Sequence, residues 1–391
     1  MRRSLPALLL FAVGCGTNEP ALLPGVDAGA EPRPTGPGLL AGGDATRATL
    51  VDLYTPPRGT FAPDLEFNPV RPGELWVVLR RAHDGSPCDE PLPGTRPARS
   101  CEDLAGAVAI FADATSPAPT ARLDEDPNSW HFMRLPTAIA FGDGDTFATA
   151  GEARTANWDD DPLDFMGPTL WSSDPQIFGI EPEGKNGSHL DMLHASPFGM
   201  GIAHERDNVY WVANGQTGSL DRYDFAAPHE IGGADHSDGR VWRWLDGELE
   251  RVPGLPAHLA FDGETGLLYA VDAGHRRVIS VDTASGRDDG QVGSDDGQLG
   301  PIPLRRDPVQ RDLIAPGRLE APSGIALAGG YLYVTDSATS SLVAFDLEGS
   351  EVARYPTGLP PGTLAGVAIG PDGNAYLGDL VSGTIRRLEA R

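Results

Sequence analysis

The feature that most constrains the fold is an internal repeat. Its clearest copy, residues 321–349, reads "APSGIALAGGYLYVTDSATSSLVAFDLEG": a proline-led apolar segment, a glycine turn and two further strand-like segments. Apolar and polar residues alternate in each segment, and Gly and Asp stand between segments, which predicts strands joined by short turns. Six copies follow one another, and they open at Pro63, Pro136, Pro197, Pro256, Pro322 and Leu364. Because one propeller blade needs about 40–50 residues, the sequence predicts an all-β, six-bladed β-propeller with long loop insertions.

The sequence pattern of the copies, P-x-G-I-A followed by L-Y-V-x-D, resembles that of the NHL-repeat family of six-bladed β-propellers. The resemblance covers about residues 60–391 and is better in the four C-terminal copies than in the first two. It implies blades of three or four strands around a central channel, a closed ring with no long exposed edge. The 49 glycines and 36 prolines also favour short elements and turns over long helices.

The N-terminus, "MRRSLPALLLFAVGCGTNEP", has the form of an export signal. Arg2 and Arg3 precede an apolar stretch too short to remain as a membrane-spanning helix. The run Ala-Val-Gly-Cys that ends at Cys15 resembles the lipobox of bacterial lipoproteins, whose cysteine is lipidated after cleavage. The alternative is an ordinary secretory signal. We expect a signal peptide over 1–14, the lipidated cysteine and a Pro/Gly-rich tether over 15–45, and the propeller over 46–391.

The remaining cysteines, Cys88 and Cys101, lie in one Pro-rich stretch. A disulfide between them suits an oxidising compartment, and lipidation of Cys15 accounts for the odd third cysteine. Gly16 is not the aspartate associated with inner-membrane retention. We therefore expect the protein in the bacterial cell envelope, attached to the outer membrane and facing the periplasm or the cell surface.

A formal net charge of −26 bears on the partners. Nucleic-acid binding requires a basic surface, so this class of partner is excluded. Anionic lipids would not attract the chain either, so membrane contact would come through the lipid anchor alone. We expect a monomer whose loops bind a protein, peptide or glycan.

Histidines gather in "GSHLDMLHASPFGMGIAH", residues 187–204. Antiparallel strands place the linker that enters a blade and its second loop on one face of the ring. This rule gives a candidate metal site of four histidines on that face: His131, His189, His194 and His258. Neutral imidazoles from several blades are donors that Zn or Cu accepts. The competing interpretation is that these histidines only bond backbone carbonyls.

The same rule places His204 and the loop 225–239 on the opposite face. This loop carries His229, Asp235, His236 and Asp238, which form either a cation site or ordinary turns. Asp159–Asp161 suggest calcium but lack the spaced D-x-D-x-D-G pattern, which favours a solvated acidic loop. The acidic duplication over 288–300 predicts a surface insertion.

Two functions remain open: a binding scaffold, or a metal-dependent lyase or hydrolase. In the second, the ion activates water or polarises a carbonyl, Arg276 stabilises an anionic group, and Asp272 orients His275 as a general base. The chain is similar to peptidyl-amidoglycolate lyases, whose zinc-binding histidines occupy one position of the repeat. At this position the six repeats of the chain have Asp64, Thr137, Phe198, Ala257, Ser323 and Ala365. That activity is therefore not expected. Gluconolactonase-type propellers use Glu, Asn and Asp around a divalent ion, and Glu152, Asn214 and Asp272 resemble that set in residue type. No nucleophile elbow, phosphate-binding loop, dinucleotide fingerprint or H-E-x-x-H motif occurs.

Overall fold

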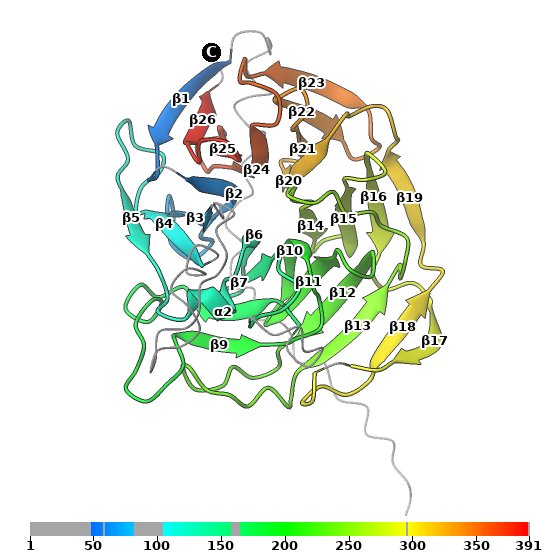
Figure 1. Ribbon diagram of the computed structural model, residues 1–391. Coiled ribbons are helices and arrows are strands. Elements are labelled where there is room, and N and C mark those ends of the chain that lie inside the picture. The colour runs from blue at the N-terminus through cyan, green and yellow to red at the C-terminus, as the bar shows by residue number, and fades with distance from the viewer. Residues whose placement is uncertain (1–47, 58, 82–104, 158–164, 295, 390–391) are drawn as a thin grey trace, which may run out of the picture. The chain divides into compact units, whose positions relative to one another are not determined.

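The computed structural model describes residues 48–57, 59–81, 105–157, 165–294 and 296–389. These residues form six β-sheets, arranged as the blades of a ring (Figure 1). The prediction of an all-β, six-bladed β-propeller is confirmed, and each of the six repeats supplies one blade. The predicted signal peptide and tether, with Cys15, lie outside the described residues, as do Cys88, Cys101 and Asp159–Asp161.

The blades are antiparallel sheets whose first strand lines the centre of the ring. The first three blades are β2 (Thr60–Phe67), β3 (Leu75–Arg81), β4 (Gly106–Phe111) and β5 (Ala121–Asp124); β6 (Pro136–Phe141), β7 (Thr146–Gly151), β8 (Thr169–Ser172) and β9 (His189–Met192); and β10 (Gly199–Arg206), β11 (Val209–Asn214), β12 (Ser219–Asp224) and β13 (Arg240–Trp244). One helical turn, α2 (Ser129–Phe132), precedes the second blade.

The last three blades follow the same plan. They are β14 (Leu259–Asp262), β15 (Leu267–Asp272), β16 (Arg277–Asp282) and β19 (Gln310–Ile314); β20 (Pro322–Ala328), β21 (Tyr331–Asp336), β22 (Ser341–Asp346) and β23 (Glu351–Pro356); and β24 (Leu364–Ile369), β25 (Ala375–Asp379), β26 (Ile385–Glu389) and β1 (Thr49–Tyr54). In the part of the chain that the structure describes, no helix is long and apolar enough to cross a membrane.

The ring closes through the strand that comes first in the chain. β1 pairs antiparallel with β26, so the outermost strand of the last blade is the first strand of the sequence. Nε of Arg386 donates to Oδ1 of Asp52 at 2.7 Å across this pair. The first and the last strand of the fold are thereby held in one sheet, and this pairing closes the ring.

Buried aromatic residues fill the spaces between blades. The second strand of every blade contributes at least one that is at most 1% exposed: Trp76, Phe147, Tyr210, Trp211, Tyr269, Tyr333 and Tyr376. The glycine that follows the opening of three of the C-terminal repeats, at 199, 324 and 366, lets neighbouring inner strands approach. A Cβ on Gly324 would lie 2.1 Å from the carbonyl oxygen of Ala365 in the next blade.

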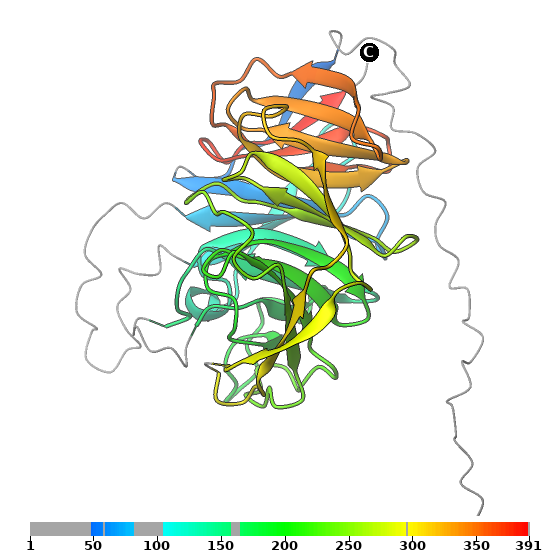
Figure 2. The same ribbon diagram turned by 90° about the vertical axis from the view of Figure 1, so that its right-hand side faces the viewer.

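The insertion between β16 and β19 adds to a neighbouring blade. β17 (Arg287–Val292) and β18 (Ile302–Arg306) form an antiparallel hairpin, and β18 pairs in parallel with β13. Figures 1 and 2 both show this yellow hairpin beside the green strands of the third blade. The predicted surface insertion over 288–300 is therefore partly an extension of a sheet, which becomes six-stranded.

Candidate metal site

A long loop of the third blade covers the outer edge of the second. The loop between β12 and β13 pairs with β9: the backbone N–H of His229 donates to the carbonyl of Leu190 at 3.1 Å, and that of Gly232 to the carbonyl of His189 at 2.8 Å. β9 is the outermost strand of its blade, so its free edge needs partners. The docking places the histidines of the loop against His189.

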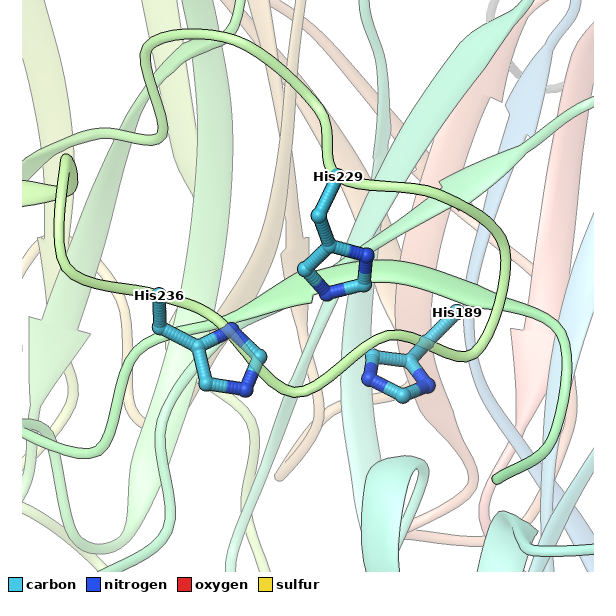
Figure 3. Close-up of side chains that lie close together, drawn as sticks. All are labelled: His189, His229 and His236. Carbon is cyan, nitrogen blue, oxygen red and sulfur yellow. The ribbon is translucent and has the colours of Figure 1, made fainter. Parts of the chain in front are cut away.

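Three imidazoles meet where the loop covers the strand (Figure 3). Ring nitrogens of His189, His229 and His236 lie within 4.8 Å of one another. The ring centroids of His189 and His229 are 5.0 Å apart, and those of His229 and His236 are 5.1 Å apart. His189 is 1% exposed and His236 is 7% exposed. The rings surround a common space in the protein interior.

Each of these rings is held through its Nδ1 atom by an oxygen. Nδ1 of His189 lies 2.9 Å from the carbonyl of Asn186, and Nδ1 of His229 lies 2.7 Å from the carbonyl of Glu230. Nδ1 of His236 lies 2.6 Å from Oδ1 of Asp191. Carbonyl and carboxylate oxygens accept hydrogen bonds, so in each neutral ring the hydrogen is on Nδ1 and Nε2 carries a lone pair.

The Nε2 lone pairs of two of these rings accept no hydrogen bond from the described residues. Nε2 of His189 and Nε2 of His229 are buried and lack a hydrogen-bond partner among the described residues. A buried polar atom without a partner costs about 1–3 kcal/mol. Burial, together with the nearby rings of His229 and His236, lowers the pKa of His189 to about 3. Its imidazole is therefore neutral at pH 7, which is the form that binds a metal.

The donor set fits a transition metal. Three imidazole nitrogens are a known zinc ligand set, and they leave a fourth position open. Bonds of 2.0–2.1 Å in a tetrahedral site place nitrogens about 3.4 Å apart, so each ring would shift inward by less than about 1 Å. The oxygens on Nδ1 are the outer contacts that fix the tautomer of metal-binding histidines. Hard cations such as calcium prefer oxygen ligands and do not match this set.

The predicted separation of the histidines between two faces is wrong for His189. The sequence placed it on a linker entering the third blade, whereas it opens β9, a fourth strand of the second blade. That strand follows the third loop of its blade, and the loop with His229 and His236 is the third loop of the next blade. The third loops of all blades lie on the same face of the ring, so the three histidines meet there.

His131 and His194 lie beside this cluster, as the sequence suggested. Their ring centroids are 5.9 Å apart, and the centroid of His194 is 6.5 Å from that of His236. His131 belongs to α2, next to Phe132, whose ring stacks on His189 at 3.7 Å. Three of the four predicted ligands are therefore in one region.

The fourth predicted ligand, His258, lines the central channel instead. Its Nε2 lies 2.9 Å from the carbonyl of Thr137, and its Nδ1 lies 3.3 Å from Oδ1 of Asp64. The channel holds a cavity of about 430 Å³ lined by residues of all six inner strands. Because Thr137 O only accepts, the neutral ring presents a lone pair to Asp64.

The hydrogen bond between Asp64 and the lone pair of His258 requires a proton on Asp64. Burial raises the pKa of Asp64 to about 8, and burial raises that of Glu66, on the same strand, to about 8. The opposite effect of burial lowers the pKa of His258 to about 4. At neutral pH a protonated Asp64 therefore donates to His258, while its other oxygen accepts from the backbone N–H of Ile139 at 3.0 Å.

These carboxyl groups predict a pH dependence of stability. Between pH 6.5 and 8 the folded state keeps protons on Asp64 and Glu66 that the unfolded chain has released, so the free energy of unfolding falls as the pH rises. The slope is up to about 1.4 kcal/mol per pH unit for each group, and it levels off above about pH 8. The histidines with lowered pKa values are neutral in both states over most of this window.

Urea unfolding at pH 6.5 and pH 8 measures the effect. The double variant Asp64→Asn/Glu66→Gln is expected to lose less stability than the wild type over this interval, and the exposed control Glu348→Gln is expected to follow the wild type. Equal losses in all three proteins would contradict the assignment of protons to these groups.

The predicted catalytic group is near the surface and apart from the three-histidine cluster. Asp272 accepts from Nδ1 of His275 at 2.8 Å, as predicted, but also from Nε of Arg277 at 2.8 Å and from the backbone of Glu250 at 3.0 Å. The side chain of His275 is 47% exposed, and Arg276 is exposed in the same turn. The contacts of Asp272 hold this loop in place, and the described residues show no contact between His275 and the cluster.

The other acidic candidates also serve the fold. Asp235 accepts from the backbone and hydroxyl of Ser237, as expected of turn chemistry. Glu152 pairs with Arg80 and Arg251, and Asn214 donates to Asp221 at 2.8 Å. The resemblance of Glu152, Asn214 and Asp272 to a divalent-ion set is therefore one of residue type, because each side chain already has protein partners.

The sequence reasoning missed that His229 and His236 share a site with His189. A signal was present, since both stretches are rich in histidine and come from consecutive repeats. The sequence did not indicate that His189 opens a fourth strand of the second blade, and this strand places His189 on the other face of the ring.

No family model matches the sequence, and no curated protein matches it. Similar solved structures include a nidogen/laminin complex (15% identity, 76% of this chain and 80% of that chain, TM-score 0.44). Two others are a structural genomics protein of unknown function from Bacteroides thetaiotaomicron VPI-5482 (10%, 88% and 76%, 0.48) and the calcium-binding protein regucalcin from Agrobacterium tumefaciens strain C58 (13%, 87% and 94%, 0.48). The strand topology of the chain itself identifies it as a six-bladed β-propeller.

Proposed function

We propose that this protein is a metal-binding β-propeller of the bacterial cell envelope, which holds a zinc or copper ion on His189, His229 and His236 and offers its loops to a binding partner. The observation that carries the proposal is the convergence of three rings, each anchored through Nδ1, with two buried Nε2 lone pairs that lack a donor. An ion accepts all of these lone pairs at once.

The position of the site favours a role in holding the scaffold together. His189 belongs to the second blade, whereas His229 and His236 belong to a loop of the third. The hairpin inserted from the fourth blade also contacts this loop, because the backbone N–H of His236 donates to Oε1 of Gln298 at 3.0 Å. An ion on the three histidines would join segments of neighbouring blades and fix the loop for a partner.

Attachment to the membrane and the kind of partner rest on the sequence alone. We propose a lipid anchor at Cys15, a Cys88–Cys101 disulfide, and an NHL-like propeller facing the periplasm or the cell surface. The net charge of −26 favours a protein, peptide or glycan partner over nucleic acid.

Elemental analysis tests the metal proposal. The full chain, purified without chelator or affinity histidines, is expected to carry about one or more equivalents of zinc or copper, and to lose that ion in His229→Ala/His236→Ala. Absence of any stoichiometric transition metal, both as purified and after incubation with zinc and dialysis, would refute the proposal.

Asp191 gives a finer test of the same site. It is 0% exposed, and its Oδ1 holds the ring of His236. Replacement by Asn keeps an acceptor but removes the charge, and loss of such an outer contact weakens metal binding about 10–100-fold. Competition with a zinc chelator measures the affinity. Asp238→Asn, an exposed position on the same loop, is the matched control and should bind zinc like the wild type. Equal affinities in the three proteins would show that Asp191 does not tune the ligand.

A second candidate function is hydrolysis or lyase chemistry at the ion. The ligand count favours it, because three protein ligands leave a position for water or substrate, as in catalytic zinc sites. The expected readout is zinc-dependent cleavage of an activated ester, abolished in His229→Ala. If the zinc-loaded protein shows no cleavage above free zinc, the scaffold role stands alone.

A further inference from the structure

The cluster of histidines extends beyond the three-histidine site. Five imidazoles lie in one connected group, in which each neighbouring pair of centroids is 5.0 to 6.5 Å apart. They come from three segments: α2, the stretch from β9 to β10, and the loop between β12 and β13. Five of the nine histidines of the chain thus belong to one connected group: His131, His189, His194, His229 and His236.

The two outer rings are anchored in the same way as the other three. Nδ1 of His194 lies 2.7 Å from the carbonyl of Phe165, and Nδ1 of His131 lies 2.9 Å from Oδ1 of Asn157. In the neutral rings Nδ1 therefore carries the hydrogen, and Nε2 carries the lone pair. All five rings of the group are thus anchored through Nδ1 by an oxygen, as the outer contacts of metal-binding histidines are.

The surroundings hold both outer rings in place and keep His131 neutral. The backbone N–H of His194 donates to Oδ2 of Asp296, which belongs to the insertion between β17 and β18. Burial and the neighbouring His194 lower the pKa of His131 to about 4, against the effect of the Asn157 and Ala156 oxygens.

We propose that His131 and His194 form a second transition-metal position beside the three-histidine site, so that the protein holds two neighbouring ions of the zinc or copper class. Two protein ligands bind more weakly than three, so this position fills second. The inference adds to the proposed function, and its test reads the two positions separately.

Metal stoichiometry provides that test. The metal-free full chain is incubated with excess Zn²⁺, dialysed and analysed for zinc. The wild type is expected to hold two equivalents, and His131→Ala/His194→Ala and His229→Ala/His236→Ala one equivalent each. The control His204→Ala/His275→Ala removes two histidines that none of the described contacts joins to the cluster, and it should hold two. Circular dichroism and thermal midpoints without metal confirm that each variant is folded.

Each other result has a definite meaning. One equivalent in the wild type, retained in His131→Ala/His194→Ala, overturns the second position and leaves the first. A second equivalent retained in that variant places the ion elsewhere and also overturns it. No zinc in the wild type overturns both the second position and the proposed function.

Copper as a paramagnetic probe tests whether the two ions are neighbours. With two equivalents of Cu²⁺, the electron paramagnetic resonance spectrum of the wild type should show dipolar broadening, which either double variant removes. A spectrum of two isolated ions in the wild type would overturn the proposal, even where the stoichiometry is two.

Discussion

Replacement of Trp211 by alanine is expected to lower the free energy of unfolding by about 3–5 kcal/mol. Trp211 is 0% exposed in β11 and contacts Trp244 edge to face, with ring centroids 4.7 Å apart. Its Nε1 donates to Oε2 of Glu205 at 2.8 Å. The substitution leaves a cavity in the core and removes a donor from a carboxylate that also binds Arg222. Chemical denaturation, followed by the fluorescence of the remaining tryptophans, measures the loss.

A matched control separates burial from substitution as such. Val309 is 68% exposed, so Val309→Ala should change stability by less than about 0.5 kcal/mol. Trp211→Phe keeps much of the volume and should fall between the two. A loss in Trp211→Ala no larger than that in Val309→Ala would contradict the packing of the third blade described above.

Zinc is expected to raise the thermal midpoint of the wild type by clearly more than it raises that of His229→Ala. A ligand that binds only the folded state stabilises it by about 2.7 kcal/mol at a hundred times its dissociation constant. For a domain of this size the shift is about 5 °C. His229 suits the test because its side chain is only partly buried, so its removal disturbs the core less than removal of His189. Differential scanning calorimetry with zinc and with chelator measures the shift.

The control for this prediction is His204→Ala. His204 lies near the end of β10, and its Nε2 contacts the carbonyl of Asp207 at 2.9 Å rather than the cluster. Its variant should respond to zinc as the wild type does. An unchanged midpoint in the wild type, or an equal rise in His229→Ala, would separate zinc binding from the three histidines.

The fold could be predicted from the sequence because its information is local. Alternating strands, Gly and Asp turns, and buried aromatic residues recur in each repeat, and each repeat forms one blade with the same neighbours. The closure by β1 was not predicted. Residues 49–54 lie outside the repeats, and their partner in β26 is more than three hundred residues away in the chain.

The candidate site was predicted only in part. His131, His189 and His194 were selected because the loop rule placed them on one face of the ring, and the structure groups them. His258 was selected by the same rule and lies in the central channel, because a residue at the start of an inner strand faces Asp64 and Thr137 there. His229 and His236 were assigned to the opposite face, because the fourth strand of the blade was not distinguished from a linker.

The sequence by itself determined the number of blades and the order of the first three strands in each, because strand periodicity and turn chemistry are encoded within each repeat. Only the tertiary structure decided which histidines meet. The loop between β12 and β13 folds onto the free edge of β9, and the hairpin β17–β18 extends the neighbouring sheet and contacts that loop. The unpaired edge of an outer strand needs hydrogen-bond partners, and no local pattern states which distant loop provides them.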